Sequence, residues 1–267
     1  MDIQAYLKRI GFAGDPWPDL ATLRRIQRGH LENIPYENLD VQLGRHLTFS
    51  VEEAFEKLVN QRRGGWCYEM NGVMGWALET IGFDVMPVTG AIKRDIRGDT
   101  AKGNHLVLGV KLDRYYLADV GLGDGPFEPT PLEEGLHGEG WRAVRLERMA
   151  GGWWRFHNYE NSFASSFDFQ HKPADWKVMQ AKCEWLQTSA DSVFTQNAVC
   201  LRTSPEGYFM LVGRVVKSIS AGGTANRMVD SAEEYCATLA AIFGIELPEA
   251  GSLWPAIIDR HKLLFGN

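Results

Sequence analysis

The sequence has 267 residues, of which 45% are hydrophobic and 23% charged, and its 28 basic and 34 acidic side chains give a formal charge of −6. This composition is typical of a soluble globular protein, and the acidic balance gives no electrostatic basis for binding nucleic acid or an anionic membrane. No apolar run is long enough to span a membrane, and the first ten residues predict an amphipathic helix rather than a signal peptide. The four cysteines are too few for a disulfide scaffold and lack C-x-x-C spacing, so we expect a cytoplasmic protein without a zinc site.

The first third of the chain has the hydrophobic period of helices. Asp2 can cap a helix that ends before Gly11, and a second helix runs from Leu20 to near Pro35. Ser50 and Glu53 predict a capping box for a third helix over 51–61. A fourth helix begins at or near Cys67 and ends at Gly82.

From Phe83 the period changes, and short alternating runs separated by Gly, Asp and Pro predict a β region over roughly 83–170. A helix is expected around 174–186, followed by two or three strands within 197–219. Ser231 and Glu234 then begin what reads as the last long helix, over 231–245. This order of helices, strands and a mixed C-terminal part predicts an α+β fold. Its sub-domains are expected to pack against one another rather than to be separable modules.

Cys67 raises the question of whether it is a core residue or a nucleophile. A free cysteine is usually buried and inert, which is the interpretation we give to Cys183, Cys200 and Cys236. Cys67 differs because two glycines precede it and a helix begins at it, so unpaired N–H groups and the positive end of the helix dipole lie beside the sulfur. Such a position favours the thiolate and can stabilise an oxyanion.

A thiolate nucleophile requires a base, and the base requires a group that orients it. His105 opens the run HLVLGVKL, and Asp119 is a carboxylate within the apolar run YLADVGLG. A buried carboxylate normally requires a partner, although His105 could be a structural histidine and Asp119 a turn residue. The other six histidines, among them His30, are expected on helix surfaces, in loops or near the terminus, with structural roles.

Strand spacing does not bring His105 and Asp119 together. A two-residue turn at 113–114 would pair Leu108 with Asp119 and leave His105 roughly 10 Å away along the strand. A longer turn, a bulge near Gly103–Asn104 or Gly109, or a bend after Asp119 is needed for contact.

The motifs around these residues resemble a known family. RGGWCYEMN is similar to the R-G-G-x-C-x-E-x-N signature of the arylamine N-acetyltransferases, and IPYENLD to their P-F-E-N-L segment. NHLVLGV followed by YLADVGLG resembles their histidine strand and D-V-G-F-G strand. SADSVFTQNAV and EEYCATLAAIFGIEL extend the similarity over nearly the whole chain in the same order.

The resemblance implies an N-terminal helical bundle over 1–83, a central β-barrel with an interdomain helical segment over 84–190, and a C-terminal α/β lid over 191–267. It also implies a Cys67–His105–Asp119 triad that moves an acetyl group from acetyl-CoA to an arylamine, arylhydrazine or N-hydroxyarylamine by a ping-pong mechanism, with no metal. Such an enzyme would act in xenobiotic metabolism. The substrate-binding positions implied are Tyr36, Asn104, Gly121, Leu122 and Gly123.

The chain departs from the family pattern at two of these positions, because Tyr36 and Leu122 each replace a common Phe. The smaller Leu122 would widen the acceptor pocket. The matching pair Glu37 and Arg63 is read as bracing the cysteine loop, the alternative being an exposed ion pair of little energetic value. The basic segment 93–103 could meet CoA phosphates or simply be solvated.

Two rival functions use the same residues. A thiol hydrolase or an amide synthase would have the same triad logic, and a binding protein could keep the fold without catalysis. The acceptor amine, the range of acyl donors and the oligomeric state do not follow from the sequence.

Overall fold

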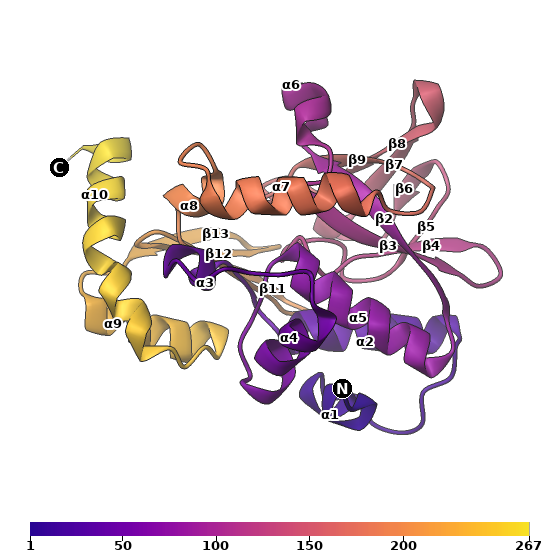
Figure 1. Ribbon diagram of the computed structural model, residues 1–267, viewed down its shortest axis with the longest axis horizontal. Helices are drawn as coiled ribbons and strands as arrows, with labels where there is room; N and C mark the ends of the chain where they lie inside the picture. The colour runs from indigo at the N-terminus through magenta and orange to yellow at the C-terminus, as the bar shows by residue number, and fades with distance from the viewer. Residues whose placement is uncertain (267) are drawn as a thin grey trace.

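The computed structural model describes residues 1–266, and the first part of this chain is helical as expected (Figure 1). The side chains of Asp2 and Ser50 accept hydrogen bonds from the first turns of their helices, and Gly82 ends the fourth with a φ of 109°. Glu53 does not complete the predicted capping box, because its carboxylate accepts the Thr48 hydroxyl. The helices are α1 (Ile3–Arg9), α2 (Leu20–Asn33), α3 (Leu39–Gln42), α4 (Val51–Phe55), continued by a π-helical turn (Glu56–Asn60), and α5 (Cys67–Ile81).

The predicted β region forms an antiparallel, nearly closed barrel. Its strand order is β5-β4-β3-β2-β9-β8-β7-β6, so the two ends of the sheet are strands that follow one another in the chain. Side chains from β8 and β9, among them Phe156, Phe167 and Phe169, fill its interior. The strands are β2 (Asp84–Ile92), β3 (His105–Lys111), β4 (Tyr115–Ala118), β5 (Thr130–Pro131), β6 (Gly135–His137), β7 (Val144–Arg148), β8 (Trp153–His157) and β9 (Ser166–Gln170), with the short helix α6 (Arg94–Arg97) between β2 and β3.

The last third contains a second, five-stranded sheet in the order β1-β10-β11-β12-β13. Its first strand, β1 (Tyr36–Glu37), comes from the helical part and pairs with β10. The other elements are α7 (Trp176–Thr188), α8 (Val193–Gln196), β10 (Val199–Thr203), β11 (Gly207–Val212), β12 (Val215–Ser220), β13 (Gly223–Met228), α9 (Ala232–Thr238), continued by a π-helical turn (Leu239–Phe243), and α10 (Trp254–Phe265).

One expectation for this part of the chain is wrong, because the helix over 231–245 is followed by another, α10. The two or three strands expected within 197–219 are present as β10, β11 and β12, and β13 is a further strand that the sequence did not indicate. Both elements gave a weak signal because every residue of β13 is exposed and α10 buries only Ile257. The sequence pattern reports burial, and these elements have little of it.

Helix α5 packs against α1, α2 and α4 on the helical side and against β2 and β3 of the barrel. The main hydrophobic core joins α1, α2 and α5 to β3 and β4, and a second core lies between the five-stranded sheet and the C-terminal helices. Figure 1 shows α9 and α10 at one end and the barrel at the other. The boundaries at 83/84 and 190/191 stay predictions.

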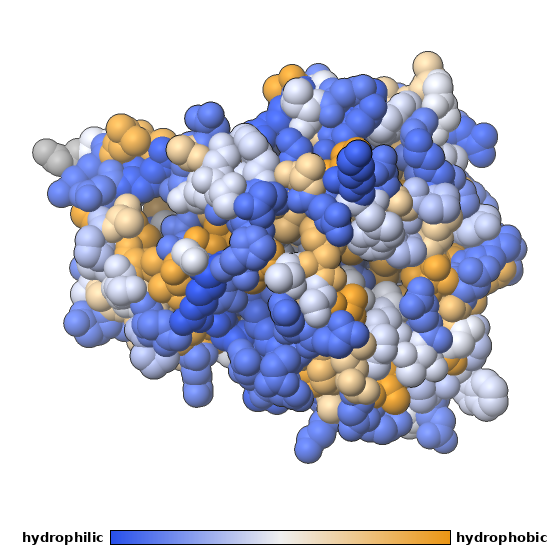
Figure 2. Space-filling view, in the orientation of Figure 1, coloured by the Kyte–Doolittle hydropathy of each residue, from blue (hydrophilic) through white to orange (hydrophobic). Residues whose placement is uncertain are grey.

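The surface is largely hydrophilic on the face seen in Figure 2, with apolar side chains gathered between α10 and the middle of the molecule. Across residues 1–266, no helix has both the length and the apolar character that a membrane span requires.

Candidate active site

Cys67 is the first residue of α5 and is 4% exposed. The preceding glycines pack closely against other parts of the chain. A Cβ on Gly64 would lie 2.2 Å from the carbonyl oxygen of Pro35, and one on Gly65 would lie 2.8 Å from a carboxylate oxygen of Glu69. The glycines therefore let the cysteine loop pack against the chain before β1, which fixes where α5 begins.

His105 and Asp119 are in direct contact, both essentially buried. His105 Nε2 lies 2.7 Å from Asp119 Oδ2, so the Nε2–H donates to the carboxylate. The other ring nitrogen, Nδ1, is buried and has no hydrogen-bond partner among residues 1–266. The thiol of Cys67 lies beside this ring and is 3.9 Å from the carbonyl oxygen of Asn104.

The electrostatics favour a charged imidazole. Burial lowers the pKa of His105, but the charge and hydrogen bond of Asp119, together with the Cys67 side chain, raise it to about 10. An imidazolium next to Cys67 is the arrangement that keeps a cysteine as thiolate.

Two features of the chain bring His105 to Asp119. The turn between β3 and β4 has three residues rather than two, so Lys111 pairs with Tyr115 and Leu108 with Ala118. Strand β4 then ends at Ala118, one residue before Asp119. Of the alternatives that the sequence left open, the longer turn is the one found, together with a departure from the strand at Asp119 itself.

Asn71, to which no role was assigned from the sequence, fixes the chain at the point where it leaves strand β4. Its Nδ2 donates to Leu106 O at 2.6 Å and to Asp119 Oδ1 at 2.8 Å, and its Oδ1 accepts from Val120 N at 3.0 Å. Asn71 thus ties β3, the carboxylate and the loop after it to α5.

Gln27 of α2 supports the same loop from another side. Its Oε1 accepts from Asp119 N at 3.3 Å and its Nε2 donates to Pro126 O at 2.8 Å. A signal for both residues was present, since Gln27 lies among the buried Leu23, Ile26 and Leu31 at helical spacing, and Asn71 lies on the buried stripe of α5. A polar residue on a buried stripe must have a partner.

A cavity of about 280 Å³ brings together most of the predicted substrate-binding residues. Cys67 does not line it, but two of the lining residues, Asn104 and Gly121, are next to Cys67. Tyr36, Asn104, Gly121 and Leu122 line the cavity, whereas Gly123 is not among its lining residues. Gly123 has a φ of 78°, and a Cβ there would lie 2.8 Å from that of Tyr36, so this glycine permits packing behind the wall.

Gly121 and Asn104 have more specific places in this cavity. A Cβ on Gly121 would lie 2.8 Å from both Cα and Cβ of Cys67, so only glycine fits there. The side-chain amide of Asn104 forms two hydrogen bonds with the backbone of Ile92. The backbone carbonyl oxygen of Asn104 is the atom that faces the Cys67 thiol.

The remaining wall comes from elements that no motif singled out. Its apolar side chains reach the cavity from α7, α8, the 158–165 turn and the five-stranded sheet, and they include Phe163, Leu186, Val193, Phe194, Val199 and Val212. Lys93 and Arg97 of the basic segment also line the cavity, whereas Arg94 pairs with Asp99 and Asp168. The segment is therefore divided between cations at the cavity and cations in ion pairs.

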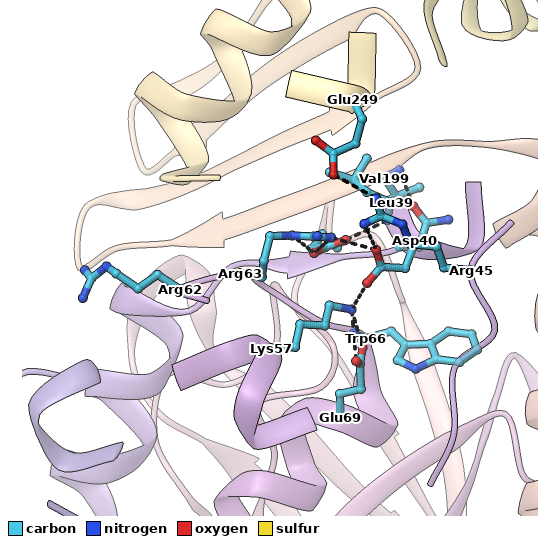
Figure 3. A network of polar contacts seen from close by, with 12 residues as sticks. Leu39, Asp40, Arg45, Lys57, Arg62, Arg63, Trp66, Glu69, Val199 and Glu249 are labelled. Carbon is cyan, nitrogen blue, oxygen red and sulfur yellow. Dashed lines mark hydrogen bonds and ion pairs between the residues drawn. The ribbon is translucent and has the colours of Figure 1, made fainter. Parts of the chain in front are cut away.

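Glu37 and Arg63 form a buried pair, not an exposed one, within a cluster drawn in Figure 3. We call Glu37, Asp40, Lys57, Arg63 and Glu69 the bracing cluster. Arg63 lies 2.6 Å from Glu37 and 3.2 Å from Asp40, and Lys57 lies 2.7 Å from Asp40 and 3.0 Å from Glu69.

The bracing cluster ends at the cysteine loop. A carboxylate oxygen of Glu69 accepts from the backbone N–H of Trp66 at 3.2 Å, immediately before Cys67. At the other end, Arg45 joins Asp40 at 3.1 Å to Glu249 at 2.8 Å, near the C-terminal helices (Figure 3). Its charges connect the start of α5 to the last third of the chain.

One histidine expected on a surface is buried instead. His30 is fully buried in α2, with its Nδ1 3.0 Å from the Tyr6 hydroxyl, and burial lowers its pKa to about 3. His30 is therefore a neutral core residue that contacts Tyr6 and takes no part in the Cys67 site. Cys183 and Cys200 are buried as expected, while Cys236 is half-buried.

Comparisons with known proteins agree on one kind of protein. A family model described as N-acetyltransferase matches residues 19–251. An arylamine N-acetyltransferase of Mycolicibacterium smegmatis is 33% identical over 260 residues, covering 92% of this chain and 93% of that protein. Arylamine N-acetyltransferase 1 of Homo sapiens is 32% identical over 237 residues, covering 80% and 81%.

Solved structures give the same result. The arylamine N-acetyltransferase of M. smegmatis superposes with a TM-score of 0.86 at 31% identity, covering 97% of this chain and 98% of that chain. The Mycobacterium marinum arylamine N-acetyltransferase in complex with CoA superposes with a TM-score of 0.86 at 28% identity, covering 96% and 98%.

Proposed function

This chain belongs to the arylamine N-acetyltransferase family, and from that premise we propose that it transfers an acetyl group from acetyl-CoA to an aromatic amine, hydrazine or N-hydroxyarylamine through acetyl-Cys67. The observation that carries the proposal is the buried contact of 2.7 Å between His105 and Asp119, with the free Nδ1 beside the Cys67 thiol.

In the first half-reaction, the Cys67 proton resides on His105 Nδ1 while Nε2–H donates to Asp119. The thiolate attacks the thioester carbonyl of acetyl-CoA, and the N–H groups at the start of α5 stabilise the oxyanion. As the bond to the CoA sulfur breaks, His105 returns a proton to the leaving thiolate. The products are acetyl-Cys67 and free CoA.

In the second half-reaction, the amine attacks the carbonyl of acetyl-Cys67. His105 accepts the proton that the amine loses, and the Cys67 thiolate leaves as the amide forms. A thioester intermediate suits a weakly basic aromatic amine because it remains as activated as acetyl-CoA.

The cavity supports an aromatic acceptor. Its walls are mostly apolar, and Leu122 leaves more room than a phenylalanine would. Lys93 and Arg97 at the same cavity offer positive charge to the phosphates of acetyl-CoA, which extends the interpretation of the basic segment. A cytoplasmic location and a role in xenobiotic metabolism belong to this proposal.

Acetyl-CoA alone provides the first test. Incubation should release one CoA per chain and add about 42 Da, the mass of one acetyl group, to the peptide containing Cys67. An aromatic amine should then remove the adduct and restore turnover. Cys67→Ala should abolish both events, by roughly 10⁴-fold or more, while Cys183→Ala should leave both unchanged.

Other outcomes identify the rival functions. Continuous CoA release without amine would indicate a thiol hydrolase. An acetyl adduct that no added amine removes would indicate an amide synthase, whose own acyl chain carries the amine. Binding of CoA without any adduct would indicate a non-catalytic relative. Substantial turnover by Cys67→Ala would contradict covalent catalysis through this residue.

A further inference from the structure

A second buried polar cluster lies outside the site described above. It consists of Asp124, Arg142, Tyr159 and Tyr208, of which Asp124, Tyr159 and Tyr208 are 0%, 5% and 1% exposed. Asp124 lies five residues after Asp119, in the loop that forms part of the cavity wall. None of these four side chains takes part in the proposed chemistry.

Asp124 and Tyr208 both hold the turn at 158–165 between β8 and β9. Asp124 Oδ2 accepts a hydrogen bond from the backbone N–H of Phe163. The hydroxyl of Tyr208 donates to Asn161 O at 2.5 Å. The turn is thus attached to the loop after Asp119 and to β11.

The position of Phe163 decides the shape of the site. Phe163 lines the cavity beside Cys67 and also a second cavity of about 540 Å³ between β11–β13 and α10. A half-buried phenyl ring at the boundary of two cavities limits what can pass between them. Loss of its backbone anchor would let the ring move and widen the pocket.

Three polar groups of this cluster make no hydrogen bond within the described part of the chain. Asp124 Oδ1, Arg142 Nε and Tyr159 OH are buried and lack hydrogen-bond partners among residues 1–266. Folded proteins pair nearly all such groups, so the anchor of Phe163 is not locked into a fully satisfied network.

We propose that Asp124 is a positioning residue that sets the width of the pocket over Cys67 by holding Phe163 in its wall. The assignment of this pocket to the acceptor rests on the proposed function, whereas the hold on Phe163 does not. A tight hold would favour small acceptors, and a weak hold would admit larger ones.

The hold should vary with pH. Burial raises the pKa of Asp124 to about 7, against the opposing effects of the N–H groups of Phe163 and Asp124 itself and the charge of Arg142, and with Asp119 raising it further. The other titratable groups facing it are Tyr36, Tyr159 and Tyr208, which burial keeps neutral by raising their pKa values. A carboxylate accepts an N–H more strongly than a carboxylic acid does, so the hold is tight above about pH 7 and weaker below it.

Two alkylating reagents of different size measure the pocket without any transferase assay. Iodoacetamide and its N-phenyl derivative share one reaction with the Cys67 thiolate, so the ratio of their rates cancels the thiolate fraction and reports access. In the native protein, the ratio of the phenyl reagent to the small one should rise as pH falls from 8 to 6. In Asp124→Asn it should be independent of pH and higher at pH 8, by about fivefold or more, the scale of one charged hydrogen bond.

Two variants separate this effect from general damage. Phe163→Ala should give the same high ratio without touching the buried carboxylate. Asp168→Asn removes another buried carboxylate, which lies in β9 and pairs with Arg155 of β8 and with Arg94, and it should keep the native ratio.

The outcomes discriminate clearly. A native ratio that is flat with pH, or a ratio in Phe163→Ala equal to that of the native protein, would overturn the proposal even if Asp124→Asn did not fold. A raised ratio in a protein that forms no acetyl adduct would retain the hold on Phe163 and reject only the proposed function.

Discussion

Two buried polar groups of residues meet at Cys67, and they differ in how completely they are paired. In the bracing cluster, each charge has an opposite charge within 3.2 Å. On the other side, His105 contacts Asp119 through one nitrogen and leaves the second nitrogen to the thiol. The paired charges of the bracing cluster hold the cysteine loop in place. The Nδ1 atom of His105, which has no other partner among the described residues, is left able to accept and return a proton.

The largest expected effect comes from removing the carboxylate that contacts His105. Asp119→Asn should lower turnover by roughly 10³- to 10⁴-fold, the scale seen when the orienting carboxylate of a triad is lost, because the amide no longer fixes the His105 tautomer. Steady-state kinetics with acetyl-CoA and an aromatic amine would measure it. Asp113→Asn, in the exposed turn of the same hairpin, is the control and should be neutral. Near-normal rates in Asp119→Asn would exclude Asp119 as the orienting group.

Breaking an ion pair of the bracing cluster should instead lower the stability of the folded protein. Arg63→Met leaves the carboxylate of Glu37 buried without its cation and should lower the free energy of unfolding by about 3–5 kcal/mol, as measured by urea denaturation. Adding Glu37→Gln should recover part of the loss. The exposed pair of Arg114 and Glu133 offers a matched control, since Arg114→Met should leave the free energy of unfolding nearly unchanged. Equal effects of the two arginine variants would contradict a bracing role.

The protonation of His105 gives a smaller, directly measurable effect. Because its pKa is raised to about 10, His105 remains an imidazolium at neutral pH. The stabilisation that this charge gives to the folded state is complete below about pH 6.5, the ordinary pKa of an imidazole, and is lost as the pH rises to about 10. The ring 15N chemical shifts of His105 should therefore remain those of an imidazolium between pH 6 and 8. A ring that loses its proton near pH 6.5 would remove the ion pair from the mechanism.

The smallest expected effect concerns the cavity wall. Leu122→Phe should raise KM for a bulky aromatic amine by about three- to tenfold and leave turnover of a small one almost unchanged, because only space is lost. A panel of acceptors of increasing size would measure it, with iodoacetamide labelling of Cys67 as the control for intact chemistry. Equal losses for every acceptor would indicate damage to the reacting groups rather than a narrower pocket.

Much of the fold and the residues of the candidate site could be predicted because local patterns in the sequence indicate them. Asp2 and Ser50 mark helix starts because their side chains accept N–H groups of the first turn, and Gly82 marks a helix end because it adopts a positive φ. Cys67 was singled out by its neighbours within five residues. Such signals require no knowledge of the tertiary structure.

The rest depends on contacts between distant parts of the chain. The approach of His105 to Asp119 needs a three-residue turn and the bonds of Asn71, which spacing alone does not supply. Phe163 lines the cavity from a turn whose backbone is bonded to Asp124, 39 residues earlier in the chain, and to Tyr208, in a later strand. Strand β1 is two residues long and acquires its pairing from β10, so no periodicity could reveal it.

That short strand has a consequence for how the molecule can be divided. Tyr36 lines the cavity and pairs with Leu201, and Leu201 belongs to a sheet formed almost entirely by the last third of the chain. A fragment ending near residue 190 would keep Cys67, His105 and Asp119, yet it would leave the edge of β1 bare and one flank of the nucleophile open to water. The proposed activity should therefore require the last third of the chain, and a fragment that retains all three candidate catalytic residues should be treated as a different molecule.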